Sequence, residues 1–447
     1  MKRIIFQSLI NWSARAARKP LILRGARQVG KTHIVRELGK NFPYYTEANF
    51  EKLPQLKKIF TPDLKPTRIR ELLELQLEKP ITPGKTLLFL DEIQECPEAI
   101  LALRYFYEEM PDLHIIAAGS LLDFAIEKIG IPVGRVSFLY LYPVSFIEFL
   151  VAIGKVKLAQ KVLENPPQQS LPDILHQQLL SLLGEYLLTG GMPEAMAHWI
   201  ASRNLTQIQQ IQSDIIEAFR QDFNKYARKH QLKYIELIFN SIPNLISQPF
   251  KYTHLQLPYQ KRELAPCLDL LIKANIIHKV FNTSANGVPL GAGVDFEKFK
   301  LVFLDVGLCE TVLGLNLKEW LLDPLSTLAN KGQLCESFIG QELLAYSQND
   351  TKVDLYYWRR EARGSQMEVD YLISDINNRI LPIEVKSGKR GNLQSLRHLI
   401  EYHPNSSYGI RFSTHNYSVY DSIHSYPLYA AAGLFRDSDL LKSFLTF

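Results

Sequence analysis

An eight-residue stretch near the N-terminus constrains this chain more than any other feature, because it fits the pattern GxxxxGK(S/T). Before it, Pro20–Arg24 is typical of a short buried strand, and after it Lys31–Leu38 has the pattern of a helix. Glycines let the backbone wrap a phosphate, and the amide N–H groups at a helix N-terminus supply positive potential. We therefore expect a phosphate-binding loop made of Gly25, Ala26, Arg27, Gln28, Val29, Gly30, Lys31 and Thr32.

The end of this loop and a second strand carry the residues that a nucleoside triphosphate site needs. Lys31 is expected to reach the β and γ phosphates, and Thr32 to offer a hydroxyl to Mg²⁺. The apolar strand Leu87–Leu90 ends in two carboxylates at the carboxyl edge of the predicted sheet. Asp91 would help to hold hydrated Mg²⁺, and Glu92 would orient or activate the attacking water. The sequence thus predicts an ATP-hydrolysing site with ATP and Mg²⁺ as cofactors.

Two further residues are candidates for contact with the γ-phosphate. The strand His114–Ala118 leads into Ser120, whose hydroxyl would arrive at the same sheet edge. Arg135 could neutralise charge that develops on the transferred phosphoryl group, either within the chain or from a neighbouring copy. A plain turn serine and an inert surface arginine are the alternatives, and the sequence leaves them open.

Strand-like segments alternate with helical ones over residues 1–153, which predicts a parallel sheet buried on both faces. Residues 154–230 have a helical pattern and are expected to form a lid and connector. Residues 231–315 read as two helices and a strand pair, which is compatible with a winged-helix-like module. Residues 316–447 return to mixed α/β. The expected fold class is therefore α/β with several domains.

Composition excludes several classes of protein. With 46% hydrophobic and 22% charged residues, the 447-residue chain is neither disordered nor fibrous. A formal charge of +5 permits an anionic partner without demanding one. The four cysteines lie far apart, which indicates neither a disulfide framework nor a zinc site and fits a reducing cytoplasm. The longest apolar stretch, residues 137–153, contains Pro143 and Glu148 and is too short for a membrane span, so we expect no membrane contact.

Two carboxylates and a lysine in the last third form a second candidate site. Glu384 and Lys386 alternate along an apolar strand and therefore point to one face, and Asp370 ends the preceding apolar stretch. If the two strands pair, the carboxylates would bind a divalent cation, and Lys386 would orient a water or stabilise the transition state. Glu336, on a predicted helix over residues 335–344, could add a third carboxylate. An exposed hairpin with the same residues and no chemistry is the alternative.

Several segments resemble the AAA branch of the P-loop ATPases. More narrowly, they resemble a prokaryotic family that joins an N-terminal AAA ATPase domain to a C-terminal nuclease-like domain of unknown function. They are GARQVGKT, LLFLDEIQ, AAGS, VGRV with LYPVSFIEFL, YLLTGGMPEAM, KLVFLDVGL, and YWRREARGSQMEVDYLI with LPIEVKSG. The resemblance implies a cytoplasmic ATP-binding protein with a restriction-endonuclease-like C-terminal domain. Asp370, Glu384 and Lys386 would form its PD-(D/E)xK core, although no proline precedes Asp370.

The favoured hypothesis is an Mg²⁺-dependent ATPase whose nucleotide state controls a nuclease-like domain that contacts nucleic acid. A second hypothesis is a slow nucleotide-dependent regulatory or scaffold switch, in which the C-terminal domain only binds. Kinase-like phosphoryl transfer to a small molecule also uses such a loop, but it fits poorly with the Asp-Glu pair and the large C-terminal region. The sequence leaves open whether the partner is DNA, RNA or protein, and whether copies assemble into a homo-oligomer.

Overall fold

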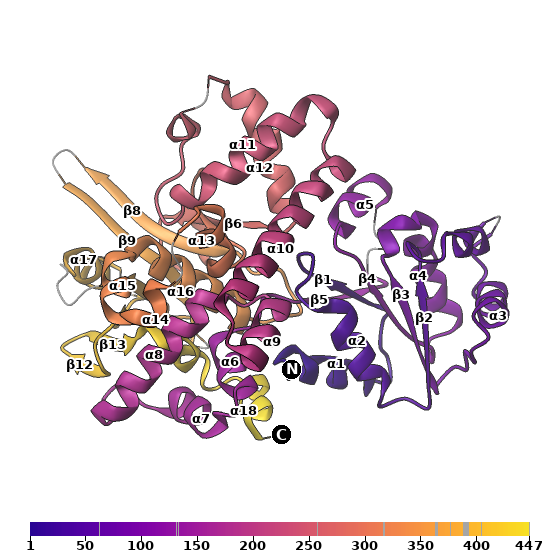
Figure 1. Cartoon of the computed structure of the whole chain (residues 1–447), viewed down its shortest axis with the longest axis horizontal. Coiled ribbons are helices and arrows are strands. Elements are labelled where there is room, and N and C mark those ends of the chain that lie inside the picture. The colour runs from indigo at the N-terminus through magenta and orange to yellow at the C-terminus, as the bar shows by residue number, and fades with distance from the viewer. Residues whose placement is uncertain are drawn as a thin grey trace.

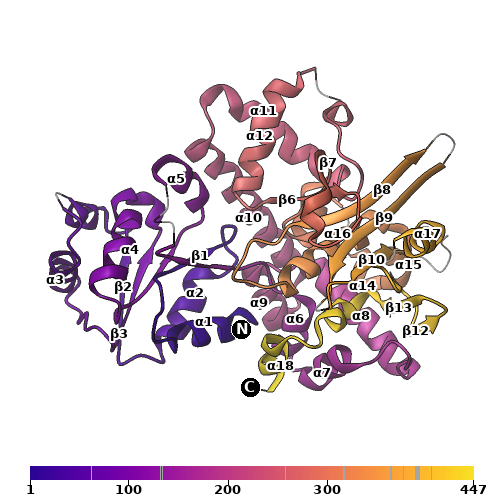
Figure 2. The same ribbon diagram turned by 180° about the vertical axis from the view of Figure 1, so that it is seen from behind.

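Two β-sheets, one formed near each end of the chain, organise the molecule (Figure 1). The computed structural model describes the chain apart from residues 62, 131, 133, 257, 316–317, 363–364, 376, 388–392, 404 and 447. Helices α9 (Pro193–Ser202) and α10 (Leu205–Tyr226) lie between the two sheets in both views (Figures 1 and 2). The N-terminal sheet and the C-terminal sheet are therefore linked through helices of the middle region.

The N-terminal sheet is parallel throughout and has the order β2-β3-β4-β1-β5. Its strands are β1 (Leu21–Arg24), β2 (Tyr44–Asn49), β3 (Thr86–Asp91), β4 (His114–Ala118) and β5 (Ser137–Tyr140). Strand β4 lies between the other two strands that lead to predicted site residues, because Ile116 pairs with Leu21 on one side and Phe89 on the other. The carboxyl ends of β1, β3 and β4 therefore meet at one edge.

Consecutive residues of the central strands enter two different cores. Leu87 and Phe89 pack in one core, whereas Leu88 and Leu90 pack in another. The first core contains residues of α1 (Ile5–Ser13) and α2 (Lys31–Gly39), and the second contains residues of α3 (Pro66–Leu77) and α4 (Pro97–Glu109). Side chains alternate between the faces of a strand, so a wholly apolar strand needs helices on both faces. The predicted parallel sheet with two buried faces is confirmed.

The middle region is helical and centres on α8 (Asp173–Thr189), which packs against several neighbours. Helix α5 (Leu122–Ile129) lies between β4 and β5, and the other helices of the middle region follow β5. They are α6 (Phe146–Ala152), α7 (Val156–Glu164), α9, α10, α11 (Leu232–Ser241), α12 (Lys261–Lys273), α13 (Val306–Val312), α14 (Glu319–Leu322) and α15 (Pro324–Asn330). Helix α8 contacts α6, α13, α14 and α15. It ends at Gly190, whose φ of 66° lies in the left-handed region that favours glycine.

A buried aspartate joins the end of α8 to the start of α13. Asp305 accepts hydrogen bonds from the backbone N–H groups of Gly191 at 2.5 Å and Leu308 at 3.0 Å. A Cβ at Gly190 would lie 2.1 Å from Asp305 Oδ1, so that position needs a glycine. Two of the sequence segments that carry the family resemblance, around Gly190 and around Asp305, therefore meet in space.

The C-terminal sheet is mixed, with the order β12-β13-β11-β10-β9-β8-β6-β7. Its strands are β6 (Ile277–Thr283), β7 (Val294–Phe303), β8 (Leu355–Ala362), β9 (Ser365–Ser374), β10 (Ile380–Val385), β11 (Gly409–Ser413), β12 (Ser418–Tyr420) and β13 (Ile423–Pro427). Helix α16 (Gly332–Tyr346) contacts β7 and β10, and α17 (Gln394–Tyr402) contacts β9, β10 and β11. The two helices share different cores with the sheet, so they cover opposite faces.

The expected order of two helices and a hairpin is present in α11, α12, β6 and β7. However, β6 also pairs in parallel with β8, through Val280 and Leu355. The hairpin is therefore the end of the eight-stranded sheet, and a contact crosses the predicted boundary between residues 315 and 316. The winged-helix-like module and the restriction-endonuclease-like domain stay predictions.

The two ends of the chain lie close together, as both views show (Figures 1 and 2), and α1 contacts α18 (Asp439–Thr446). One continuous core runs from α1 and α2 through α8 to α16. All four cysteines are buried and free. In the described part of the chain, no helix combines the length and the hydropathy that a membrane span requires.

Candidate nucleotide site and C-terminal carboxylate cluster

The eight-residue loop connects β1 to α2, as the motif requires, and its backbone uses conformations that favour glycine. Gly25 and Gly30 have φ values of 147° and 99°. A Cβ at Gly25 would lie 2.2 Å from the carbonyl oxygen of Leu141, so the loop packs too closely there for any side chain. Gln28 also has a positive φ, of 63°. The glycines thus permit a tight turn that presents backbone N–H groups to a ligand.

The ammonium group of Lys31 lies within this loop. Its Nζ donates to the carbonyl oxygens of Gly25 at 2.9 Å and Ala26 at 2.6 Å. Burial lowers the pKa of Lys31 to about 8. A buried cation with only carbonyl partners gains strongly from an anion nearby, which suits phosphate oxygens.

Thr32 and Asp91 present oxygen atoms side by side at the carboxyl edge of the sheet. The Thr32 hydroxyl lies 3.3 and 3.4 Å from the two carboxylate oxygens of Asp91, and Asn49 Nδ2 donates to Asp91 at 2.9 Å. Burial, with the neighbouring charge of Glu92, raises the pKa of Asp91. A hydroxyl and a carboxylate are the hard oxygen donors that Mg²⁺ prefers, so these residues fit that ion.

Glu92 and Ser120 lie at the same edge and share it with a residue that the sequence did not single out. Gln94 Nε2 donates to Glu92 Oε2 at 2.6 Å, which fixes the orientation of that carboxylate. Gln94 Oε1 is buried and has no hydrogen-bond partner among the described residues. It lies beside Gly119, where a Cβ would approach it to 1.9 Å. An orphaned buried acceptor between the predicted water-activating and phosphate-sensing residues fits a site that holds a hydroxyl group or water.

Arg135 lies at the end of the strands opposite to the loop. It precedes β5, whose first residue Ser137 pairs with the first residue of β1, Leu21, so Arg135 stands at the amino ends of the parallel strands. Its Nε donates to Glu108 at 2.8 Å on the surface. The structure therefore does not bring Arg135 to the loop within one chain, and only a role from a neighbouring copy stays a prediction. Val133 of the same motif lies outside the described residues.

The loop also contacts the long helix α10. Arg27 Nη1 donates to both carboxylate oxygens of Asp222, at 2.7 and 2.8 Å. Asp222 is almost buried, and the adjacent Tyr226 stacks on Phe124 of α5 with the ring centroids 4.5 Å apart. Arg27, Ser120, Asp222 and Tyr226 line one small cavity. The ion pair thus ties a residue of the predicted nucleotide loop to the middle region, a contact between positions that no local pattern connects.

Arg3 holds the loop through the Val29 carbonyl, and the sequence had not indicated it as a site residue. Its guanidinium donates to the Val29 carbonyl at 3.0 Å, to the Tyr142 carbonyl at 2.6 Å and to Glu148 at 3.1 Å. Arg3 and Glu148 are both buried. A basic residue near a chain start is usually exposed, so the sequence held no signal for this role.

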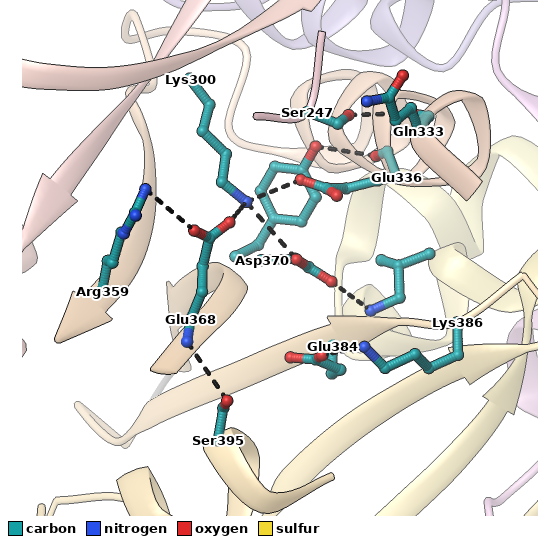
Figure 3. Close-up of polar contacts among 12 residues, drawn as sticks. Ser247, Lys300, Gln333, Glu336, Arg359, Glu368, Asp370, Glu384, Lys386 and Ser395 are labelled. Atoms are coloured by element: carbon teal, nitrogen blue, oxygen red, sulfur yellow. Dashed lines mark hydrogen bonds and ion pairs between the residues drawn. The ribbon is translucent and has the colours of Figure 1, made fainter. Parts of the chain in front are cut away.

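Strands β9 and β10 bring Asp370 beside β10, as the sequence predicted (Figure 3). Asp370 Oδ2 accepts a hydrogen bond from the Val385 N–H at 2.7 Å. Glu384 contacts Lys386. Burial and the charge of Asp370 raise the pKa of Glu384 to about 7. The hairpin between β9 and β10 therefore places these three residues near one another.

A buried lysine occupies the space between Asp370 and the helix α16. Lys300 of β7 has an Nζ 3.0 Å from Glu336, 2.5 Å from Glu368 and 3.5 Å from Asp370 (Figure 3). Burial alone would lower the pKa of Lys300, but the carboxylates of Glu336, Asp370 and Glu368 hold it well above its usual value. Neither Lys300 nor Glu368 was a sequence candidate.

The predicted metal ligands Glu336, Asp370 and Glu384 do not form one cluster. Leu381, Ile383 and Val385 share a core with α16, so alternation along β10 directs the Glu384 side chain away from that core, although its carboxylate stays within range of the Asp370 charge. Among the residues that the structure describes, no three His, Cys, Asp or Glu side chains are arranged to hold a metal ion. With Lys300 placed among the carboxylates, the described side chains therefore do not fit the metal centre that the sequence suggested.

Three stretches of the chain match models of known protein families. Residues 17–150 match an AAA domain, residues 180–319 match domain of unknown function DUF8612, and residues 331–431 match domain of unknown function DUF4143. No curated protein matches the chain. Among solved structures, the chain is similar to the Walker-type ATPase PABY2304 of Pyrococcus abyssi, with 14% identity and a TM-score of 0.44 over 69% of this chain and 93% of that chain. The parallel sheet, the loop and the family match together identify residues 17–150 as a P-loop domain of the AAA type.

Proposed function

We propose that this protein binds and hydrolyses ATP with Mg²⁺ and that its nucleotide state controls the C-terminal nuclease-like domain, which contacts nucleic acid. The observation that carries the proposal is that a glycine-rich loop, a buried lysine, a hydroxyl–carboxylate pair and a glutamate oriented by Gln94 meet at one end of the parallel sheet. These residues are Lys31, Thr32, Asp91 and Glu92. Oligomerisation and a role for Arg135 from a neighbouring copy are part of the same proposal.

The chain's own residues can carry out the hydrolytic step. Thr32 and Asp91 would hold Mg²⁺, which supplies neutralisation of charge on the phosphate oxygens. Lys31 would exchange its two carbonyl partners for the β and γ phosphates. Glu92, oriented by Gln94, would position the attacking water and accept its proton.

Arg27 supplies a route from the nucleotide to the middle region. The γ-phosphate is an anion that would compete with Asp222 for the Arg27 guanidinium. Farther along the same helix, Gln212 donates to the carbonyl oxygens of Leu188 and Thr189 at 3.0 and 3.1 Å. A shift of α10 would therefore act on the end of α8, which Asp305 joins to the start of α13 directly after β7.

The second hypothesis, a slow switch whose C-terminal domain binds without cleaving, is favoured by one observation. Lys300 neutralises the carboxylates that a metal-dependent nuclease would leave free for its cation. The nucleic-acid contact itself rests on the resemblance of Asp370, Glu384 and Lys386 to the PD-(D/E)xK arrangement.

The test is to incubate the full chain with Mg²⁺-ATP and single-stranded, duplex and branched DNA and RNA, while phosphate release and strand cleavage are followed together. Lys31→Ala and Glu92→Gln should abolish phosphate release, whereas Lys79→Ala, at an exposed lysine, should leave it unchanged. Phosphate release that survives Glu92→Gln would refute the water-activating role.

The C-terminal half of the proposal is tested in the same reactions. Nucleic acid that binds and changes the rate of phosphate release, with the effect lost in Asp370→Ala but kept in the exposed-site variant Asp437→Ala, is the expected result. Phosphate release that no nucleic acid alters, together with no binding, would contradict the nucleic-acid contact and leave the ATPase standing.

A further inference from the structure

The side chain of Lys300 is among the most deeply buried charged groups of the C-terminal sheet. It starts on β7, opposite Val280 of β6, and only 1% of it is exposed. Its Nζ lies 5.1 Å from the centroid of the Tyr357 ring on β8. A long cationic side chain is costly to bury, so its position requires strong compensation from partners.

The compensation comes from three carboxylates that converge on the ammonium group from two elements. Glu336 approaches from α16 at 3.0 Å, and Glu368 and Asp370 approach from β9 at 2.5 and 3.5 Å (Figure 3). An ammonium group has three N–H donors, and each can face one of these carboxylates. Lys300 thus sits where oxygen ligands converge, which is the place that a hard divalent cation would take.

An irregularity in β9 produces this convergence. The pairing of β8 and β9 shifts between Tyr356 and Trp358, where Tyr356 faces Leu372 and Trp358 faces Val369. The additional residue on β9 is a β-bulge, which re-aims side chains at the point where it occurs. As a result Asp370 reaches Lys300, and the neighbouring Tyr371 hydroxyl donates to the Glu336 carbonyl at 2.8 Å.

The charges around the site are already close to balance. The three carboxylates face two cations, Lys300 and Arg359, whose guanidinium lies 3.8 Å from Glu368. A divalent cation placed among the same oxygens would meet the ammonium at short range in a buried site, where like charges repel strongly. Glu384 Oε2 has no partner among the described residues, but one oxygen is far fewer than a hard cation requires.

We infer that Lys300 is the resident cation of this cluster and excludes a divalent metal from the carboxylates of Glu336, Glu368 and Asp370. The cluster is therefore an internal salt-bridge centre that fastens β7 and α16 to β9 without metal. The inference does not rest on ATP hydrolysis, because every residue in it lies outside the nucleotide site.

Terbium is a suitable probe, because Tb³⁺ prefers oxygen ligands and its luminescence is sensitised by nearby tyrosines. Tyr357 and Tyr371 both lie at the cluster. The experiment uses the full chain in an Asp91→Asn background without nucleotide, which removes a carboxylate of the other candidate cation site. Three proteins are compared in that background: the parent, Lys300→Met and Lys300→Arg, each with and without Asp370→Asn.

The parent should show no tyrosine-sensitised emission that depends on Asp370. Lys300→Met should gain one saturable Tb³⁺ site, at least about tenfold tighter than any in the parent, which Mn²⁺ displaces and Asp370→Asn removes. Lys300→Arg should behave as the parent, because it keeps a cation among the carboxylates. Far-UV circular dichroism establishes that each variant is folded.

Two results would overturn the inference. One is a saturable, Asp370-dependent Tb³⁺ site in the parent, displaced by Mn²⁺ while Lys300 is intact. The other is a folded Lys300→Met variant that gains no site. If Lys300→Met does not fold, the comparison of the parent with Asp370→Asn decides alone: Asp370-dependent emission refutes the exclusion of metal, and its absence supports it.

Discussion

Asparagine in place of Asp222 is expected to tighten ATP binding, because it removes the carboxylate that competes with the γ-phosphate for Arg27. The substitution keeps the shape of the side chain and deletes only its charge. Arg27 Nη1 contacts both oxygens of Asp222, at 2.7 and 2.8 Å, and the arginine side chain is 35% exposed whereas the aspartate is 7% exposed. The pair is therefore intermediate between a surface and a buried ion pair.

The magnitude follows from that position. Exposed ion pairs contribute about 0.2–1 kcal/mol, and hydrogen bonds to charged groups contribute about 1.5–3 kcal/mol. With one partner largely buried and the other one-third exposed, about 1–2 kcal/mol is a reasonable value for the contact. If ATP binding breaks it, Asp222→Asn should lower the dissociation constant for ATP by about 5–30-fold.

Titration of a fluorescent ATP analogue measures this in a Glu92→Gln background, which keeps the nucleotide intact. A double-mutant cycle with Arg27→Ala isolates the coupling, since removal of Arg27 should abolish the gain from Asp222→Asn. Glu217→Gln is the matched control, because it removes a carboxylate from an exposed position of the same helix. A dissociation constant that Asp222→Asn leaves within about twofold of its parent, or a gain that persists without Arg27, would refute the competition.

Three further predictions address the packing, the loop and the assembly. Gly190→Ala should lower the melting temperature far more than Gly314→Ala. Both glycines have a φ of 66°, but an added Cβ would meet Asp305 only at Gly190. Equal losses of melting temperature would exclude the close contact. Burial lowers the pKa of Lys31 to about 8, and bound phosphates would raise it. Above pH 8, ATP binding should therefore be accompanied by uptake of a proton by Lys31, and ATP should bind more weakly as the pH rises. Calorimetry in buffers of different ionisation enthalpy measures that proton. Because Arg135 is remote from the loop of its own chain, its proposed role requires assembly, and light scattering that gives only 51.3 kDa with and without ATP would contradict it.

The predictions that the structure confirmed depend on local patterns. The strand His114–Ala118 was predicted residue for residue, and the helix that follows the phosphate loop begins at Lys31 as expected. A wholly apolar strand predicts helices on both faces of its sheet, and a glycine-rich loop predicts a tight turn that can bind phosphate. The position of Asp370 beside β10 could also be predicted from the sequence, because two strands joined by a short turn pair as a hairpin.

The errors have identifiable physical causes. Of the two roles expected for Arg135, the one within a single chain fails, because Arg135 precedes a parallel strand whose amino end lies at the end of the sheet remote from the loop. The role from a neighbouring copy stays a prediction. The period of two predicted which residues of β10 share a face, but it did not reveal the bulge in β9 that turns Asp370 toward α16.

By itself, the sequence determined the nucleotide loop, the carboxylates that follow β3 and the α/β character of both ends of the chain. Only the tertiary structure decided which charges meet: Arg27 with Asp222, Arg3 with Glu148, and Lys300 with the C-terminal carboxylates. Local patterns report the conformation and the buried face of a segment, since both depend on neighbours a few residues away. The partner of a buried charge depends on how distant elements pack, because its ionic form persists only where another part of the chain compensates it.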